Sequence, residues 1–288
     1  MNKIFCADGN FYLHRCWSTL KTSRPIEDVL PPNFCGLVMK DACLVKATHI
    51  LVAFDGPSIF RYDLYDNYKG DRREAKIQKD DEAEGKKDIY QYLSAVRAYL
   101  TKGGITWVQK KKYEADDVLA SCLLQYGNIS DTLVIAGTGD KDIYQALHGK
   151  HKVYNSGPKE KPIIIDSAKA EKLKGVPISG MIMYQTLLGD KIDSIPQILP
   201  PAKARKAVLE WKTFKNWYTK GTKEDKRWLN ANQVKLTLNR KLVELVTDLS
   251  LPEVHELKVP KLELPQMPKA WQAYQELTYP KRKSLFRR

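Results

Sequence analysis

The chain has 288 residues, 43% of them hydrophobic, and a net charge of +14 at pH 7. This length suffices for one large domain, or for a large domain with a smaller attachment. No run approaches the roughly 20 consecutive apolar residues of a membrane span, and no basic segment leads into an apolar one at the N-terminus, so we expect neither a membrane protein nor a secreted one.

The net charge and the cysteines indicate what the protein binds and in which compartment it lies. A globular chain with an isoelectric point near 9.4 most often binds a polyanion, and nucleic acid is the first candidate, with a membrane surface or simple solubility as alternatives. The five cysteines are odd in number and show no CxxC spacing. We therefore expect reduced thiols in a cytoplasmic protein, without a zinc site.

Short apolar or β-branched runs alternate with helical patterns through the first part of the chain. Strands are expected at residues 3–7, 49–54, 105–108, 132–136, 152–154 and 162–165. Helices are expected at residues 11–20, 35–46 (after a proline-containing loop), 88–100 and from 114 onward. This alternation predicts an α/β fold with a mostly parallel central sheet and helices on both faces.

From about residue 167 the pattern is helical, with expected helices at 167–174, 178–188, 202–211 and within 213–247. Lys203, Arg205 and Lys206 stand near the start of the third helix, where a helix–turn–helix suits contacts with a DNA backbone. A merely solvent-facing basic helix is the alternative. We expect three parts: an α/β core at 1–166 with a charged segment near 61–87, a helical region at 167–250, and a proline-containing extension with a basic tail at 251–288.

Acidic residues follow three of the expected strands. Asp8 and Asp55 come directly after the first two, and Asp140 and Asp142 follow the strand at 132–136. A single aspartate there usually forms a turn. In open parallel sheets, however, ligands bind beyond the carboxyl ends of the strands.

A second acidic group opens a helix. Glu114, Asp116 and Asp117 precede an apolar helical pattern, and about 60° separates the first and third of them around the helix axis. Acids in a first turn complement the helix dipole, so a helix start and a metal site both remain open. Together with the strand ends, six or seven carboxylates would share one edge. Divalent cations would be needed to neutralise them, and oxygen ligands favour Mg²⁺, with Mn²⁺ as a substitute.

Several motifs carry a family resemblance over residues 3–250. They are Cys6–Arg15, Ala53–Pro57 with Phe60-Arg61, Tyr68-Lys69-Gly70-Asp71-Arg72, Tyr113–Val118, Thr138–Asp142, Gly175-Val176-Pro177, Leu188–Pro196 and Asn239–Leu242. In this order they resemble the structure-specific 5′-nucleases: the 5′→3′ exonuclease domain of bacterial DNA polymerase I and the stand-alone flap endonucleases and exonucleases of bacteriophages. The resemblance implies a PIN-like nuclease core followed by a helical DNA-binding region of the helix–three-turn–helix kind.

The resemblance also implies a site. Two or more Mg²⁺ or Mn²⁺ ions would be bound, directly or through water, by Asp8, Asp55, Glu114, Asp116, Asp117, Asp140, Asp142, Asp190 and Asp193. Lys69 and Arg72 would act on the scissile phosphate as electrophilic catalysts, with Asp140 as a core ligand. Arg61 would hold a neighbouring phosphate, Tyr68 would stack on a terminal base, and Lys203, Arg205 and Lys206 would bind duplex phosphates. A solvated charge run is the alternative for Lys69 and Arg72.

The sequence departs from the family at two places. The family has a glycine-rich hairpin that offers backbone amides to a phosphate and carbonyls to K⁺, where this chain has 197–203 with Pro200 and Pro201. Proline has no amide hydrogen, so the resemblance leaves K⁺ undecided. Residues 73–85 are short and acidic-rich, which leaves open whether an arch closes over the site.

The predicted function is a metal-dependent 5′→3′ exonuclease and flap endonuclease. Its partners would be DNA with 5′ ends, nicks or flaps and RNA–DNA hybrids, and the enzyme would be a cytoplasmic monomer that binds no membrane. Two alternatives remain. One is a small metal-dependent RNase of related fold, which the helical region at 167–211 argues against. The other is a catalytically inactive DNA-structure-binding protein, which would be expected to have lost carboxylates.

Overall fold

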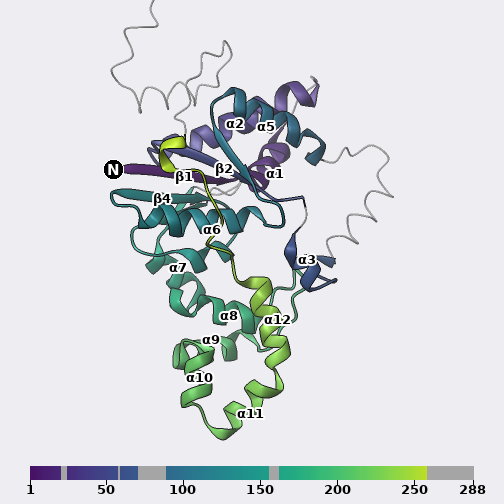
Figure 1. Cartoon of the computed structure of the whole chain (residues 1–288), viewed down its shortest axis with the longest axis vertical. Coiled ribbons are helices and arrows are strands. Elements are labelled where there is room, and N and C mark those ends of the chain that lie inside the picture. Colours follow the sequence, from purple (N-terminus) through teal and green to yellow (C-terminus); the bar gives the residue numbers. More distant parts are fainter. Residues whose placement is uncertain (21–24, 58, 71–88, 156–161, 258–288) are drawn as a thin grey trace, which may run out of the picture.

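The fold is α/β with a helical region below the sheet (Figure 1). The computed structural model describes residues 1–20, 25–57, 59–70, 89–155 and 162–257. The strands are β1 (Asn2–Asp8), β2 (His49–Phe54), β3 (Thr106–Gln109), β4 (Thr132–Gly137), β5 (Lys152–Asn155) and β6 (Ile163–Ile165). They form one sheet in the order β3-β2-β1-β4-β5-β6. Every neighbouring pair is parallel except β5 and β6. The α/β class with a mostly parallel sheet is confirmed.

Helices cover both faces of this sheet. They are α1 (Gly9–Thr19), α2 (Ile26–Leu44), α3 (Phe60–Leu64), α5 (Leu93–Lys102) and α6 (Ala115–Gln125), with 3₁₀ turns η1 (Ile89–Tyr92), η2 (Tyr126–Asn128) and η3 (Asp142–Ala146). α1, α2 and α5 lie on one side and α6 on the other (Figure 1). Residues Ile4 to Ala7 of β1 are fully buried because this strand has neighbours on both edges and helices on both faces.

The helix expected at 35–46 begins earlier than the sequence suggests. α2 starts at Ile26 and carries Pro31 and Pro32 inside it, where the sequence indicated a loop. Leu30 and Phe34 are fully buried against the sheet. Their burial offsets the two backbone hydrogen bonds that the prolines cannot donate.

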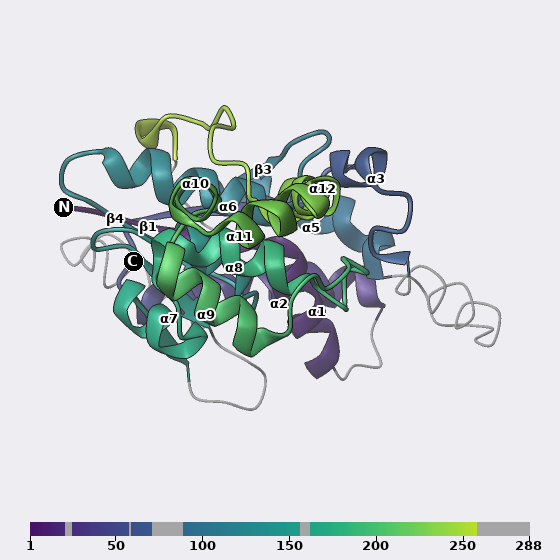
Figure 2. The same cartoon turned by 90° about the horizontal axis from the view of Figure 1, so that it is seen from below.

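The helical region follows the sheet in the chain. It consists of α7 (Ser167–Lys174), η4 (Ile178–Gly180), α8 (Met181–Leu188), α9 (Pro201–Trp211), α10 (Phe214–Lys220), α11 (Lys223–Ala231), α12 (Gln233–Val243) and η5 (Val254–Glu256). Seen from below, α12 lies beside α3, and the two helices are in contact (Figure 2). One apolar cluster runs from Ile4 of β1 through α6 to Val208 of α9. This shared core fixes the helical region relative to the edge of the sheet where the acids lie.

Residues 244–252, which we call the return segment, run back from α12 along α6. The sequence suggested helix up to 247, but α12 ends at Val243 and the return segment is extended. Its backbone groups are bound by side chains of the α/β core, so it gives up helical hydrogen bonds without leaving those groups unpaired. The side chains are those of Arg61, Asp117, Ser121, Gln125, Tyr126 and Gln145.

Within the described ranges, no helix is both long and apolar enough to cross a bilayer. The five cysteines are all buried and free.

Candidate active site

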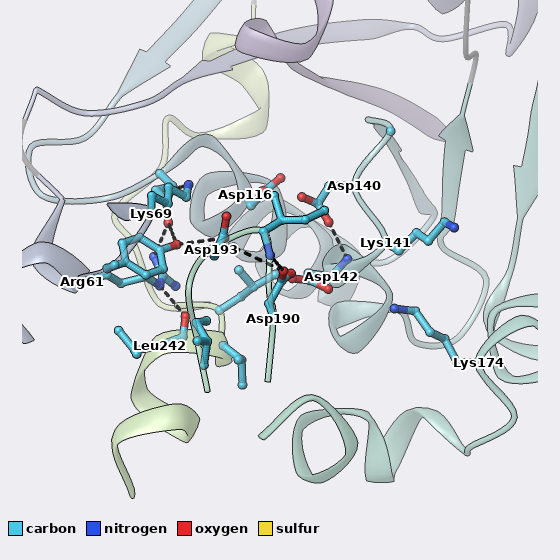
Figure 3. Close-up of a pocket in the computed structure, with 17 residues that line it drawn as sticks. Arg61, Lys69, Asp116, Asp140, Lys141, Asp142, Lys174, Asp190, Asp193 and Leu242 are labelled. Carbon is cyan, nitrogen blue, oxygen red and sulfur yellow. Dashed lines mark hydrogen bonds and ion pairs between the residues drawn. The ribbon is translucent and has the colours of Figure 1, made fainter. Parts of the chain in front are cut away.

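Two hollows meet at the carboxyl edge of the sheet. The first has a volume of about 390 Å³ and is lined by carboxylates from α6, the loop after β4 and the turn after α8 (Figure 3). The second, of about 420 Å³, is lined by Asp8, Asn10, Phe11, His14, Asp55, Tyr90, Gly139 and Asp140. Gly139 and Asp140 line both. Asp140 therefore stands where the two hollows join.

Thr138 ties the ends of β1 and β4 together beneath this junction. Its hydroxyl donates to Asp8 Oδ2 at 3.0 Å and accepts from the Asp140 amide at 3.1 Å. Asp8 also caps α1, since its Oδ1 accepts from the Phe11 amide at 3.0 Å. The turn-forming and the ligand interpretations of Asp8 are thus compatible: the cap orients a carboxylate that faces the second hollow.

Asp55 is held more tightly than the sequence indicated. Its Oδ1 accepts from the Ala115 amide at the start of α6 at 2.8 Å, and Asn10 Nδ2 donates to its Oδ2. Both oxygens therefore have protein donors. Asp55 still lines the second hollow, and its negative charge raises the pKa of Asp8.

The acids at the junction are electrostatically crowded. Burial, and then the charges of Asp55 and Asp140, raise the pKa of Asp8 to about 7. Burial raises the pKa of Asp116 well above its usual range, and the charges of Asp140 and Asp8 raise it further. Both shifts have the same cause, because several buried negative charges are unfavourable without a compensating cation.

Asp116 gives the clearest indication that this site binds a cation. Its Oδ1 is buried and has no hydrogen-bond donor. A buried carboxylate oxygen without a partner costs about 1–3 kcal/mol or more, so such an atom calls for an explanation. Asp116 lines the first hollow with Asp140 (Figure 3), and hard oxygen donors of this kind suit Mg²⁺ or Mn²⁺. The residues present therefore fit a divalent metal.

The acids line the hollows from several elements of the fold. Among the residues that the structure describes, no three His, Cys, Asp or Glu side chains are already arranged to hold a metal ion. Like charges keep apart unless a cation lies between them. The arrangement is a set of carboxylates that line two joined hollows.

Asp142, Asp190 and Asp193 bring acids from both halves of the chain to the first hollow (Figure 3). The Asp142 amide donates to Asp140 Oδ1 at 2.8 Å, which links the two acids after β4. Asp190 Oδ1 accepts from the amides of Ile192 and Asp193 at 2.7 and 3.3 Å, inside the turn after α8. Burial, and then the charge of Asp140, raise the pKa of Asp142 to about 6.

Glu114 anchors the basic side of the same hollow. It accepts hydrogen bonds from Arg61 at 3.0 Å, from the Tyr68 hydroxyl at 3.0 Å and from Lys69 Nζ. Burial alone would lower the pKa of Lys69, but the charges of Glu114 and Asp193 outweigh it and keep that pKa above its usual range. Lys69 is therefore a fixed positive charge at the hollow. The lysine is 20% exposed.

Asp117 lines neither hollow, and this position argues against a direct metal ligand. Arg61 donates to both of its carboxylate oxygens, at 2.7 and 2.8 Å, and the amides of Glu114 and Val246 donate to them as well. With no exposed surface, Asp117 is the N3 acid of a capping box with Glu114 and the partner of a buried arginine. Here the helix-start interpretation is the right one.

The same geometry corrects the expectations for Arg61 and Tyr68. Arg61 is 1% exposed, and its donors go to Glu114, Asp117 and the carbonyls of Leu242 and Glu244, so it has no group left for a phosphate. Tyr68 is 3% exposed with its hydroxyl on Glu114, so its ring has no face for a nucleic-acid base. Both residues build the wall of the hollow.

The remaining basic candidates lie elsewhere. Arg72 falls outside the described residues, as does most of the expected arch. Lys203, Arg205 and Lys206 are all exposed on α9, which begins at Pro201 after Pro200. Arg205 Nε donates to the Lys174 carbonyl at 3.4 Å, so this side chain also joins α9 to α7. Their contact with DNA stays a prediction.

Sequence reasoning missed three residues that line the hollows, Asn10, Lys141 and Lys174, and a fourth, Gln185, that donates to Asp142 from behind. Lys141 and Lys174 line the first hollow from the side opposite Lys69 (Figure 3). Lys174 looked like an ordinary cation in the last turn of its helix, and Gln185 lies within an apolar helix. Lys141 could have been predicted to lie at the site, because it stands between the candidate acids Asp140 and Asp142.

Known proteins resemble the chain over most of its length. It is 25% identical to a 5′-3′ exonuclease of Aquifex aeolicus over 287 residues, covering 96% of this chain and 92% of that protein. It is 29% identical to DNA polymerase I of Rhizobium leguminosarum over 86% of this chain but only a quarter of the polymerase's length.

Solved structures show the same fold. Two structures of the bacteriophage T5 enzyme, one with divalent zinc ions and one a flap endonuclease complex with DNA and metal ions, match with a TM-score of 0.68 and 20% identity. They cover 85% of this chain and 90% of the T5 chain.

The family profile named "5'-3' exonuclease, N-terminal resolvase-like domain" matches residues 3–175, which hold β1 to β6, α7 and most of the acids described above. Since this match spans more than half of the sequence, the chain belongs to the 5′-3′ exonuclease family.

Proposed function

We propose that this chain is a metal-dependent 5′→3′ exonuclease and flap endonuclease. Its substrates would be 5′ ends and branched structures of duplex DNA, including RNA primers annealed to DNA, in replication or repair. The observation that carries the proposal is the meeting of acids from α6, the loop after β4 and the turn after α8 around hollows that share Asp140. Folding this many acids together makes sense for a site that binds cations.

Asp116 and Asp140 are the central candidates for holding the metals. Asp8 would contribute from the second hollow, and Asp142 and Asp190 from the lower side of the first. When bound, two divalent ions would make hydroxide available at neutral pH and stabilise the departing 3′-oxygen. Mg²⁺ is the expected ion and Mn²⁺ a working substitute. We propose no role for K⁺.

The chain's own residues bind and orient the substrate. Lys69 offers a fixed positive charge at the hollow, where a scissile phosphate would gain negative charge. Glu114 holds the Lys69 side chain, and Arg61 in turn holds Glu114. Lys203 and Lys206 on α9 would bind phosphates of the duplex and so set which phosphodiester reaches the acids.

We also propose that the protein acts as a monomer in the cytoplasm. The five buried free cysteines support a reducing compartment.

The test is cleavage of three 5′-labelled DNAs, a flapped duplex, a nicked duplex and a single strand, with Mg²⁺ or with excess EDTA. We expect cleavage of the flapped and nicked duplexes with Mg²⁺ only, with short products released from the labelled end. Binding without cleavage in Mg²⁺ and Mn²⁺ would indicate an inactive DNA-binding protein. The same assay on a 5′-labelled RNA strand tests the other alternative: cleavage of that RNA without cleavage of any of the three DNAs would indicate an RNase.

A further inference from the structure

Two glutamines connect an acid of the site to the end of α12. Gln185 of α8 is 5% exposed, and its Nε2 donates to Asp142 Oδ1 at 2.7 Å. Its Oε1 accepts from Gln145 Nε2 at 3.0 Å. Gln145 Nε2 also donates to the Val243 carbonyl at 3.0 Å, and its Oε1 accepts from the Leu245 amide at 2.9 Å. We call this chain of contacts the glutamine relay.

The direction of every hydrogen bond in the relay is fixed by its ends. An ionised carboxylate only accepts, so Gln185 must turn its amide nitrogen towards Asp142. A backbone amide only donates and a carbonyl only accepts, so Gln145 must turn its oxygen to Leu245 and its nitrogen to Val243. With these two orientations, Gln145 Nε2 faces Gln185 Oε1, so the hydrogen bond between the two glutamines also forms. Flipping either amide would set like groups against each other, so the relay has one arrangement.

We propose that Gln185 and Gln145 are positioning residues that hold the Asp142 carboxylate for a divalent metal and make its position depend on the docking of α12. The inference rests on the proposed function. One oxygen of Asp142 is bound by the relay, and Asp142 lies beside Asp190 in the first hollow (Figure 3). Hydrogen bonds to a ligating carboxylate fix its orientation and so contribute to metal affinity.

The chemistry of the donor supports this role over a purely structural one. A lysine or arginine at 185 would neutralise Asp142 and compete with a cation for it. The neutral amide orients the carboxylate and leaves its full negative charge for the metal. The far end of the relay is the backbone of Val243 and Leu245, at the junction of α12 and the return segment. A shift of α12 would therefore reach Asp142 through two side chains.

Gln185→Met keeps the length and volume of the side chain and removes both of its relay contacts. We expect it to weaken Mn²⁺ binding about 10-fold, the lower end of the range for residues that orient a metal ligand. Gln145→Met should weaken it in the same direction but less, since Gln185 keeps its contact with Asp142. The double variant should be no weaker than Gln185→Met alone, because both substitutions interrupt one chain of contacts.

Gln125→Met is the matched control. Gln125 Nε2 donates to the carbonyls of Thr247 and Leu249, at 3.0 and 2.8 Å. It therefore also binds the return segment from the α/β core, but it contacts no acid of the site. We expect Gln125→Met to lower the unfolding temperature and to leave Mn²⁺ affinity within twofold of wild type.

The measurement is a titration of the full chain with Mn²⁺ in the absence of DNA, with free Mn²⁺ followed by electron paramagnetic resonance. The unfolding temperature of each variant is measured beside it by circular dichroism. Weaker Mn²⁺ binding in Gln185→Met but not in Gln125→Met supports the relay. Equal Mn²⁺ affinity in Gln185→Met and wild type overturns it and leaves the proposed function standing. A wild-type chain that binds no Mn²⁺ overturns both.

Discussion

Arg61 and Asp117 lie 56 residues apart in the sequence and form a two-pronged ion pair, with N–O distances of 2.7 and 2.8 Å and side chains 1% and 0% exposed. The pair joins α3 to the start of α6. Because Arg61 also binds the carbonyls of Leu242 and Glu244, it ties the end of α12 to the same point. The wall of the first hollow depends on this one guanidinium.

Replacing Arg61 should therefore destabilise the whole chain. Arg61→Met leaves Asp117 buried without its partner, and we expect a loss of about 3–5 kcal/mol in the free energy of unfolding. Arg240→Met is the control, because Arg240 pairs with Glu244 on an exposed surface and should cost less than about 1 kcal/mol. Both are measured by guanidinium unfolding followed by circular dichroism. Equal stabilities of the two variants would contradict the role assigned to Arg61.

Tyr68 offers a test that separates a structural hydroxyl from a base-stacking ring. Tyr68→Phe keeps the ring and removes the hydrogen bond to Glu114, so we expect the unfolding free energy to fall by about 1–2 kcal/mol. If the ring of Tyr68 stacked on a base instead, Tyr68→Phe would change neither DNA affinity nor stability, and only loss of the ring would weaken DNA binding. Unchanged stability in Tyr68→Phe, with loss of duplex affinity in Tyr68→Leu alone, would restore the stacking interpretation.

Asp117 shows why the site could be predicted only in part. Around the helix axis Glu114 and Asp117 lie on one side, and the sequence offers metal binding and helix capping as equal explanations. The buried ion pair with Arg61 decides in favour of helix capping. Because Arg61 is 56 residues away in the sequence, no local spacing around Asp117 indicates this contact. By contrast, Asp8 and Asp140 follow strands that lie side by side, β1 and β4, so parallel topology alone places them at one edge.

The strands of the sheet could be predicted from the sequence, whereas the start of α2 and the return segment could not. Apolar or β-branched runs predicted the six strands of the described sheet to within one residue at each end. The central strands β1 and β2 were the clearest, because they are buried on both faces and are nearly continuous apolar runs. Pro31 and Pro32 suggested a loop, but the burial of Leu30 and Phe34 outweighs the local cost of the two prolines and the helix continues through them. The return segment was missed for a similar reason. Its backbone partners, among them Ser121 and Gln125, come from a distant helix.

Duplex binding should depend steeply on salt through α9. If Lys203 and Lys206 each bind a phosphate, replacing either with alanine should reduce the slope of log affinity against log salt by about 0.9. Lys40→Ala, at an exposed site on α2 across the sheet from the helical region, should leave the slope unchanged. Fluorescence anisotropy with a labelled duplex in Ca²⁺ measures all three. Identical slopes would show that α9 does not face the DNA.

Stability should fall in mild acid through His151. Its Nδ1 accepts from the Val134 amide at 3.0 Å, and burial lowers its pKa from 6.5. Because the folded pKa lies below the unfolded one, the unfolded chain binds more protons, so this stabilisation is full above pH 6.5 and is lost as the pH falls towards the folded pKa. His151→Gln should flatten the dependence of the unfolding temperature between pH 5 and 7. The same slope in both proteins would contradict this assignment.

The most direct test compares Asp140→Asn with the wild-type chain on a 5′-labelled flapped duplex in Mg²⁺, with duplex affinity measured in parallel. Asp28→Asn, an exposed acid on α2, serves as the matched control. Losing a ligand shared by both hollows should remove about 4 kcal/mol of transition-state stabilisation, or roughly a thousandfold in rate, while duplex affinity stays within a few-fold of wild type. Cleavage by Asp140→Asn at the rate of Asp28→Asn would contradict the central claim that the acids around Asp140 hold the catalytic metals.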